Sequence, residues 1–147
     1  MAHHRTVIRQ AIVALLTAGG TLAGPRVHDH PTDPRRAFPA LTLFDDSEAQ
    51  RPLSLPAGAA RPLERLYALD ITAEVQEVDD YATTRDTLLA EVEALLATAG
   101  AIPGVKVITP AGSQPGQYSE GERPICVGRQ RFEILYYTPQ GAPATTL

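Results

Sequence analysis

The residues of this chain that could do chemistry include a short run with metal-ligand character. His28, Asp29 and His30 are consecutive, and on an extended chain the two imidazoles would point to the same side. Imidazole and carboxylate groups are common ligands of zinc and iron. A complete site needs a third and a fourth ligand, however, and the other histidines are His3 and His4 near the start of the chain. We therefore expect a polar turn here and no bound metal.

Three other features are typical of catalytic sites only in part. The stretch GGTLAGPR, residues 19–26, spaces its glycines as a phosphate-binding loop does, but Pro25 stands where that loop needs its lysine. Ser113 lacks the flanking glycines of a nucleophile elbow, and no histidine lies near it in the sequence. Cys126 falls on the side of its strand that we assign to the core, where thiols are usually inert. These patterns predict neither an enzyme nor a cofactor site.

The most informative charged residues lie in the stretch GERPICVGRQRFEILYYTP, residues 121–139. Side chains of an extended strand alternate between its two sides, so one side here is suited to a core. The other side carries Arg129, Arg131 and Glu133 in its middle, with apolar residues and Tyr137 at its ends. An apolar border around a charged centre is more typical of a protein interface than of a surface in water. We expect this side to meet another protein.

Composition limits the classes of protein to which this chain can belong. The chain has 147 residues, enough for one domain with a real core, and 44% of them are hydrophobic and 20% charged. A net charge of −4 gives no reason to expect nucleic acid as a general partner. The absence of tryptophan argues against a stacking platform for single strands, and one cysteine permits no internal disulfide.

The N-terminal stretch, residues 1–24, has two interpretations. Early positive charge, an apolar run and small residues at its end are features of a signal peptide. Arg9 and Gln10 interrupt the apolar run, however, and the apolar positions recur at helical spacing: Val7, Ile8, Ala11, Ile12, Leu15 and Leu16. We favour an amphipathic helix that Gly19–Gly20 ends. Since no segment approaches the ~20 apolar residues of a membrane span, we expect a soluble protein that is made inside the cell.

The middle of the chain predicts strands and one long loop. Residues 26–28 form a short strand, and residues 40–44 form another that acidic turn residues close. Residues 50–62 hold three prolines and a glycine, which predicts a mobile loop. The longest strand lies in residues 63–78, with one apolar and one polar side, as in a half-buried strand.

The second helix lies within residues 79–100, with an apolar stripe that includes Leu88 and Val92. We expect Thr83 or Thr84 to cap it and Gly100 to end it. A short strand at 104–110, a loop at 111–124, the last strand, and a flexible tail from about residue 139 complete the chain. This order predicts a single α+β domain: a two-layer sandwich of a mixed, mostly antiparallel sheet of four to five strands with two helices on one face.

Charge is distributed unevenly along the chain. Residues 1–36 carry five arginines and two aspartates, a net of +3, whereas residues 64–93 carry nine acids and two arginines, a net of −7. In a monomer this is an ordinary solvated surface. In a head-to-tail oligomer, opposite patches of this kind let one copy dock on the next.

The layout resembles that of a known family. An N-terminal amphipathic helix is followed by a short strand, by FPALTLFDDSE, by a long strand that runs into EVQEVDDYATTRDTLLAEVEALL, and by YSEGERPICVGRQRFEILYYTP. This order is similar to that of the tail terminator proteins of long-tailed bacteriophages, also called minor tail or tail-completion proteins, over about residues 5–139. The resemblance implies a structural virion protein at the junction of tail and neck that forms a ring, usually of six copies. Such a ring caps the tail tube, stops its polymerisation, offers a surface to the head connector and lets DNA pass, with no catalytic residue, no cofactor and no membrane.

Within such a ring we expect Arg129, Arg131 and Glu133 to meet acidic residues of a neighbouring copy. The acids that we name lie at the end of the long strand and in the turn after it: Glu74, Glu77, Asp79 and Asp80. Two alternatives stay open. One is another neck protein of the same virion, such as a head-completion or connector-stopper protein, and the other is a small bacterial metal- or ligand-binding domain.

Overall fold

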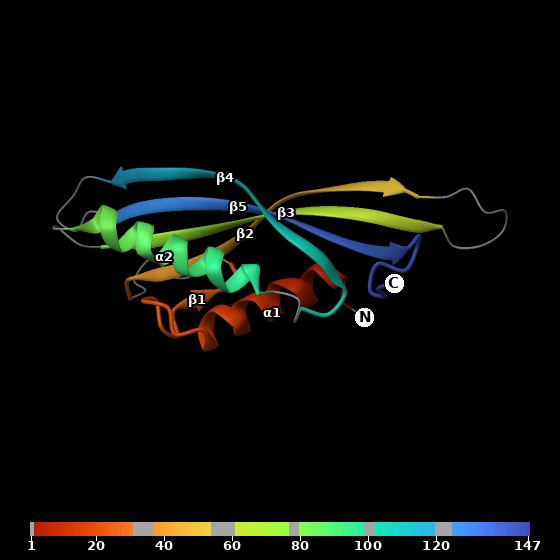
Figure 1. Ribbon diagram of the computed structural model, residues 1–147, viewed down its shortest axis with the longest axis horizontal. Coiled ribbons are helices and arrows are strands. Elements are labelled where there is room, and N and C mark those ends of the chain that lie inside the picture. Colours follow the sequence, from red (N-terminus) through yellow and green to blue (C-terminus); the bar gives the residue numbers. More distant parts are fainter. Residues whose placement is uncertain (1, 31–36, 54–60, 77–79, 99–101, 120–124) are drawn as a thin grey trace.

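A computed structural model describes residues 2–30, 37–53, 61–76, 80–98, 102–119 and 125–147. Two helices and five strands follow one another in the order α1, β1, β2, β3, α2, β4, β5, and the strands form a single sheet in the order β1-β2-β3-β5-β4 (Figure 1). β1 is parallel to β2, and all other neighbours are antiparallel. The bounds are α1 His4–Ala18, β1 Val27–His28, β2 Ala40–Pro52, β3 Pro62–Val75, α2 Tyr81–Ala97, β4 Val105–Ser119 and β5 Ile125–Pro139. This confirms the α+β class and the predicted order of elements.

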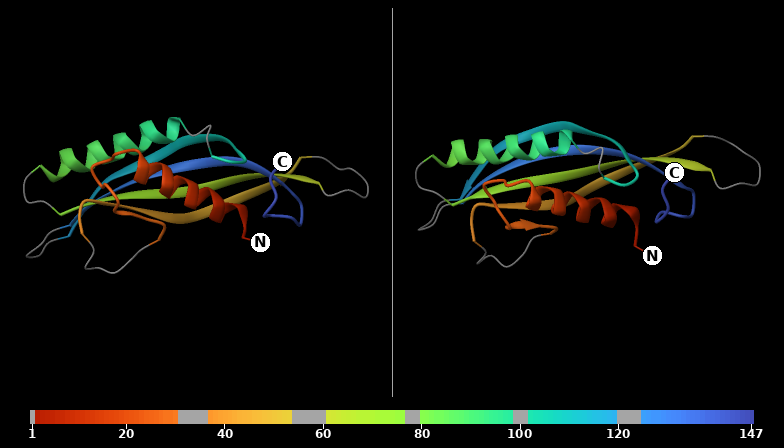
Figure 2. Two further views of the ribbon diagram at one scale, coloured as in Figure 1. Left: turned by 90° about the horizontal axis from the view of Figure 1, so that it is seen from below. Right: turned by 60° about the horizontal axis from the view of Figure 1, so that its bottom comes forward.

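Both helices lie on the same face of the sheet (Figure 2). The predicted apolar stripes form the core, and the most buried members of the helices are Ile8, Ile12 and Leu16 of α1 and Leu88, Val92 and Leu96 of α2. Opposite them, β3 contributes Tyr67, Leu69 and Ile71, which are at most 1% exposed. α1 ends at Gly19 as predicted. A Cβ atom at Gly19 would lie 2.4 Å from a methyl group of Leu95, so glycine lets the end of α1 approach α2 closely.

α2 begins earlier than its sequence suggests. Its first residue is Tyr81, and Asp80 precedes it with a left-handed backbone, φ 57°, and no side-chain cap. The first helical hydrogen bond runs from the Thr84 amide to the Asp80 carbonyl, so Thr83 and Thr84 lie inside the first turn and the predicted threonine cap is wrong. The helix ends at Ala97, and the expected end at Gly100 lies outside the described residues.

Two strands are longer than predicted. β2 does not stop at an acidic turn after Phe44, because an irregularity in register between Asp45 and Ser47 absorbs one residue and the strand continues to Pro52. β4 continues to Ser119 through a region that we expected to be a loop, with register shifts after Pro110 and after Gln114. β4 is an edge strand, where proline costs no ladder hydrogen bond and bulges are common.

The structure differs from expectation in the two segments that the sequence predicts to be mobile, residues 50–62 and the residues after 139. Of the loop predicted for residues 50–62, residues 50–52 belong to β2 and Pro62 begins β3; residues 54–60 lie outside the described part, so mobility there stays a prediction. The segment after residue 139, where we expected a flexible tail, is held by backbone hydrogen bonds. The Gln140 amide donates to Arg61, the Leu147 amide to Tyr137, and the His4 amide to the carbonyl of Pro143.

Candidate functional site

β5 has one side that faces the core and one side that carries the charged residues. Cys126, Phe132, Ile134 and Tyr136 are at most 2% exposed, which confirms the predicted core side. The side chains of the other side lie on the sheet face that no described helix covers (Figure 2), here called the open face. β3 shows the same two sides, yet the polar residues on its open side are buried rather than half exposed: Asp70, Thr72 and Glu74.

The charged centre of the open face is paired within the chain. Arg131 lies opposite Asp70 in the β3–β5 register, and its guanidinium donates from Nε to Oδ1 at 3.0 Å and from Nη2 to Oδ2 at 3.3 Å. Asp46 lies 3.1 Å from the same Nη2. These hydrogen bonds with Asp70 raise the pKa of Arg131. Sequence reasoning missed Asp70 as the partner, because only the strand register places it there.

Arg129 is less fully paired than Arg131. Its Nη1 lies 3.8 Å from Asp70 Oδ2, and its side chain remains 44% exposed. It lines a hollow of about 250 Å³ with Asp70, Arg131 and residues 111–114 of the irregular part of β4. Asp70 is only 5% exposed at its side chain and is already held by Arg131, so Arg129 can offer its guanidinium to a carboxylate from outside.

An apolar row crosses the same face farther along the strands. Ala49 of β2 pairs with Leu66 of β3, Leu66 with Leu135 of β5, and Leu135 with Val107 of β4. Leu66 is 37% exposed and Val107 48%, while Ala49 is exposed and Leu135 is partly exposed. The row, Ala49–Leu66–Leu135–Val107, contains one of the apolar residues that we expected to border the charged centre, Leu135, and extends over four strands. Contiguous exposed apolar surface makes the row a candidate for contact with another protein.

The acids expected to meet Arg129 and Arg131 have different positions. Glu74 is 5% exposed and accepts a hydrogen bond from the Thr42 hydroxyl at 2.8 Å, so burial inside its own chain makes it unsuitable for contact with a neighbour. Asp80 is exposed at the start of α2. Glu77 and Asp79 lie outside the described residues.

Glu133 and Tyr137 are partly exposed on the open face. Glu133 lies opposite Ala68, and Tyr137 lies opposite Glu64. They therefore flank the row at Leu135 on both sides along β5, and both stay candidates for an interface.

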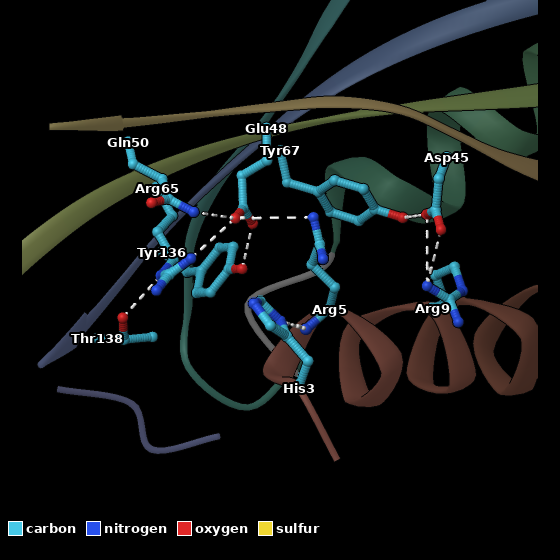
Figure 3. Close-up of polar contacts among 10 residues, drawn as sticks. All are labelled: His3, Arg5, Arg9, Asp45, Glu48, Gln50, Arg65, Tyr67, Tyr136 and Thr138. Atoms are coloured by element: carbon cyan, nitrogen blue, oxygen red, sulfur yellow. Dashed lines mark hydrogen bonds and ion pairs between the residues drawn. The ribbon is translucent and has the colours of Figure 1, made fainter. Parts of the chain in front are cut away.

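A buried polar network joins the start of α1 to the sheet, and no local sequence pattern indicates it (Figure 3). Arg5 Nη1 of α1 lies 3.8 Å from Glu48 Oε2. Glu48 of β2 and Arg65 of β3 form an ion pair at 2.9 Å with side chains 2% and 5% exposed. Glu48 also accepts hydrogen bonds from the Tyr136 hydroxyl and from Gln50, and Arg65 Nε donates to the Thr138 hydroxyl at 2.7 Å. Nearly complete burial of the ion pair makes this network a means of holding elements together rather than a ligand site.

The pKa values in the network follow from burial and from these bonds. Burial alone would raise the pKa of the Glu48 carboxyl, but the hydrogen bonds from Tyr136, Gln50 and Arg65 outweigh it, and the pKa lies below its ordinary value. Burial, with a smaller contribution from the Glu48 carboxylate, raises the pKa of the Tyr136 hydroxyl. The stable form therefore has an ionised Glu48 and a protonated tyrosine.

A second set of polar contacts holds the middle of α1 against β2 and against the segment after β1. Arg9 Nε donates to Asp29 at 2.8 Å, and its Nη1 donates to Asp45 Oδ2 at 3.0 Å. The Tyr67 hydroxyl also donates to Asp45, and burial followed by this carboxylate raises the pKa of Tyr67. Of the two aspartates predicted to form a turn after Phe44, Asp45 is therefore a strand residue that binds α1, whereas Asp46 pairs with Arg131.

The other candidate residues do not lie together in one site. Among the described residues, no three His, Cys, Asp or Glu side chains gather where they could hold a metal ion, and Asp29 is engaged by Arg9. Cys126 is buried, and its sulfur lies 3.6 Å from Arg85 Nη1. Ser113 is exposed and lines the hollow at Arg129. In the part of the chain that the structure covers, neither helix has the length and apolar character needed to cross a bilayer.

No protein-family model matches the chain, and no curated protein matches it.

Proposed function

We propose that this protein is a ring-forming tail terminator of a long-tailed bacteriophage. In this role a ring of copies caps the tail tube, ends its polymerisation and presents a joining surface to the head connector. The element order from α1 to β5, on which the resemblance rests, supports the proposal at the level of fold. The ring, the tube and the connector are the partners that it implies, and DNA passes through the ring.

One observation carries the proposal: the open face is suited to contact with protein. Its apolar row offers Leu66 and Val107 to the outside, and Arg129, farther along β5, is exposed beside a polar hollow. Full burial of an exposed large apolar side chain contributes ~1.5–3 kcal/mol, and Leu66 and Val107 are 37% and 48% exposed. Covering each therefore adds part of this amount at every contact of a ring. Exposed apolar side chains and an exposed arginine on one face are residue types that protein interfaces favour.

Charge is consistent with a ring through which DNA slides. The chain carries a net charge of −4, and within residues 64–93 the acids Asp80, Asp86 and Glu93 are exposed, whereas Asp70 and Glu74 are buried. A surface with an excess of carboxylates repels phosphates and releases no counterions, so DNA has little tendency to adhere.

The test is binding to assembled tail tubes of the same virion. Purified protein is mixed with tubes and with isolated connectors, and negative-stain electron microscopy locates it by a gold-labelled C-terminal tag. The proposal expects label at one end of each tube. Label on connectors but never on tubes would instead indicate a connector-stopper protein, and label on neither would refute a role in the neck.

A further inference from the structure

We infer that a second copy of the chain docks the outer side of its α2 on the open face, so that its Asp80 meets Arg129 and its last helical turns cover the apolar row. This inference rests on the proposed ring, because it names the two surfaces that meet at each seam. Of the four acids named from the sequence it retains Asp80, which is exposed, and excludes Glu74, which is buried.

The outer side of α2 is acidic at one end and small along the rest. Residues three and four apart share a helix side, and one such series is exposed throughout: Asp80, Thr83, Thr87, Ala90, Ala94 and Ala97. Asp80 makes no side-chain cap and no ion pair with another described residue. Small side chains after it let a flat surface approach the helix closely.

Along β5, the open face has a matching order: a charged end followed by an apolar end. Arg129 lies beside the polar hollow, and Leu135 lies in the apolar row six residues later. At ~3.3 Å per strand residue these two positions are about 20 Å apart. Along α2, the fourteen residues from Asp80 to Ala94 span about 21 Å at ~1.5 Å each. A helix laid along the strand therefore brings the acid to the arginine and the alanines to the leucines at once.

The apolar end has a second complementary feature. A groove of about 240 Å³ lies beside the end of α2, lined by Leu96, Ala97, Ile108, Pro110 and Phe132 together with Glu93. Its mostly apolar lining gives the exposed Val107 or Leu66 of the neighbouring copy a place to bury a side chain.

The two surfaces lie on opposite faces of the sandwich. α2 covers one face of the sheet (Figure 2), and the alternating burial along β5 places Arg129 and Leu135 on the other. A contact between different surfaces is heterologous and leaves a free copy of each surface at the ends. Repetition then produces a closed ring or an open filament. A symmetric dimer through this contact is excluded by geometry.

Disulfide trapping tests the pairing directly. Leu135→Cys and Ala94→Cys are prepared as separate variants, mixed at high concentration and oxidised, with Ala14→Cys on the exposed side of α1 as the matched control partner. We expect covalent dimers only in the mixture of the first two, with each dimer containing one chain of each kind. A Leu135→Cys variant that dimerises with itself, or equally well with Ala14→Cys, would overturn the inference.

Charge reversal gives a second readout. Arg129→Glu should weaken self-association at least about thirtyfold, as loss of one partner of a desolvated charge pair does, and Asp80→Arg in the same chain should restore most of it. Rings at tube ends without the Leu135–Ala94 cross-link and without this rescue would contradict this seam and leave the proposed function intact. Tubes that never acquire a ring contradict the function itself.

Discussion

Replacing Arg65 by methionine should destabilise the fold far more than a surface ion pair would suggest. The Arg65 and Glu48 side chains are 5% and 2% exposed and lie 2.9 Å apart. Removing one partner of a buried pair leaves the other charge without compensation and costs ~3–5 kcal/mol. Methionine keeps most of the apolar stem, so lost packing adds little. We therefore expect the free energy of unfolding to fall by about 4 kcal/mol, and Tm by about 8–16 °C for a chain of this length.

Urea unfolding followed by circular dichroism measures this loss, and the chain provides a matched control. Arg51 and Glu64 join the same two strands at 3.0 Å, but their side chains are 70% and 25% exposed. Arg51→Met should cost only ~0–1 kcal/mol. Equal losses in Arg65→Met and Arg51→Met would refute the reasoning that burial, not the ion pair as such, sets the magnitude.

Three further changes test other parts of the fold. Because hydrogen bonds hold the pKa of Glu48 below its ordinary 4.5, its contribution is complete above that pH and is lost as pH falls through the folded value. Glu48→Gln should thus be less stable at neutral pH but flatten the loss of stability below about pH 5; an unchanged acid limb in urea titrations would count against this. Gly104→Ala puts a Cβ 2.5 Å from the Thr146 side chain at φ +77°, and hydrogen exchange should then show faster amides in residues 140–147; unchanged protection there would contradict the close contact. Leu16→Ala removes a fully buried side chain and should cost ~2–5 kcal/mol by urea unfolding, and a loss below 1 kcal/mol would show that α1 is not part of the core.

The periodic parts of the fold could be predicted from the sequence. Apolar residues at helical spacing placed both helices, and strict alternation in residues 125–139 identified which side of β5 faces the core. These predictions succeed because the residues of a helix or strand that face the core recur at the period of that element. They also identified the open face by its charged centre and apolar flank.

Local sequence signals failed where tertiary pairing outweighed them. Glycines and prolines within residues 111–124 predicted a loop there, but an edge strand with bulges accommodates Gly112, Pro115 and Gly116, and β4 runs on to Ser119. Asp45 predicted a turn, but it is a strand residue that accepts hydrogen bonds from Arg9 and Tyr67, which lie 36 and 22 positions away in the sequence. Contacts between residues this far apart in the sequence cannot be predicted from a short stretch of sequence.

The candidate site was predicted only in part for the same reason. The sequence indicated Arg129 and Arg131 but not Asp70, which the β3–β5 register places opposite Arg131 and within 3.8 Å of Arg129. It also proposed Glu74 as a partner for a neighbour, although this carboxylate is bonded to Thr42 inside the chain. Charge counts along a sequence cannot distinguish an exposed acid from a buried one.

The length distribution of tail tubes tests the central proposal most directly. Tail-tube protein of the same virion is polymerised with and without increasing amounts of the purified protein, and tubes are measured by electron microscopy. We predict that tubes stop growing once about one ring per tube is available, with a ring visible at one end. Tubes of unchanged length with bare ends, at protein concentrations well above that ratio, would contradict the proposal that this chain terminates the tail.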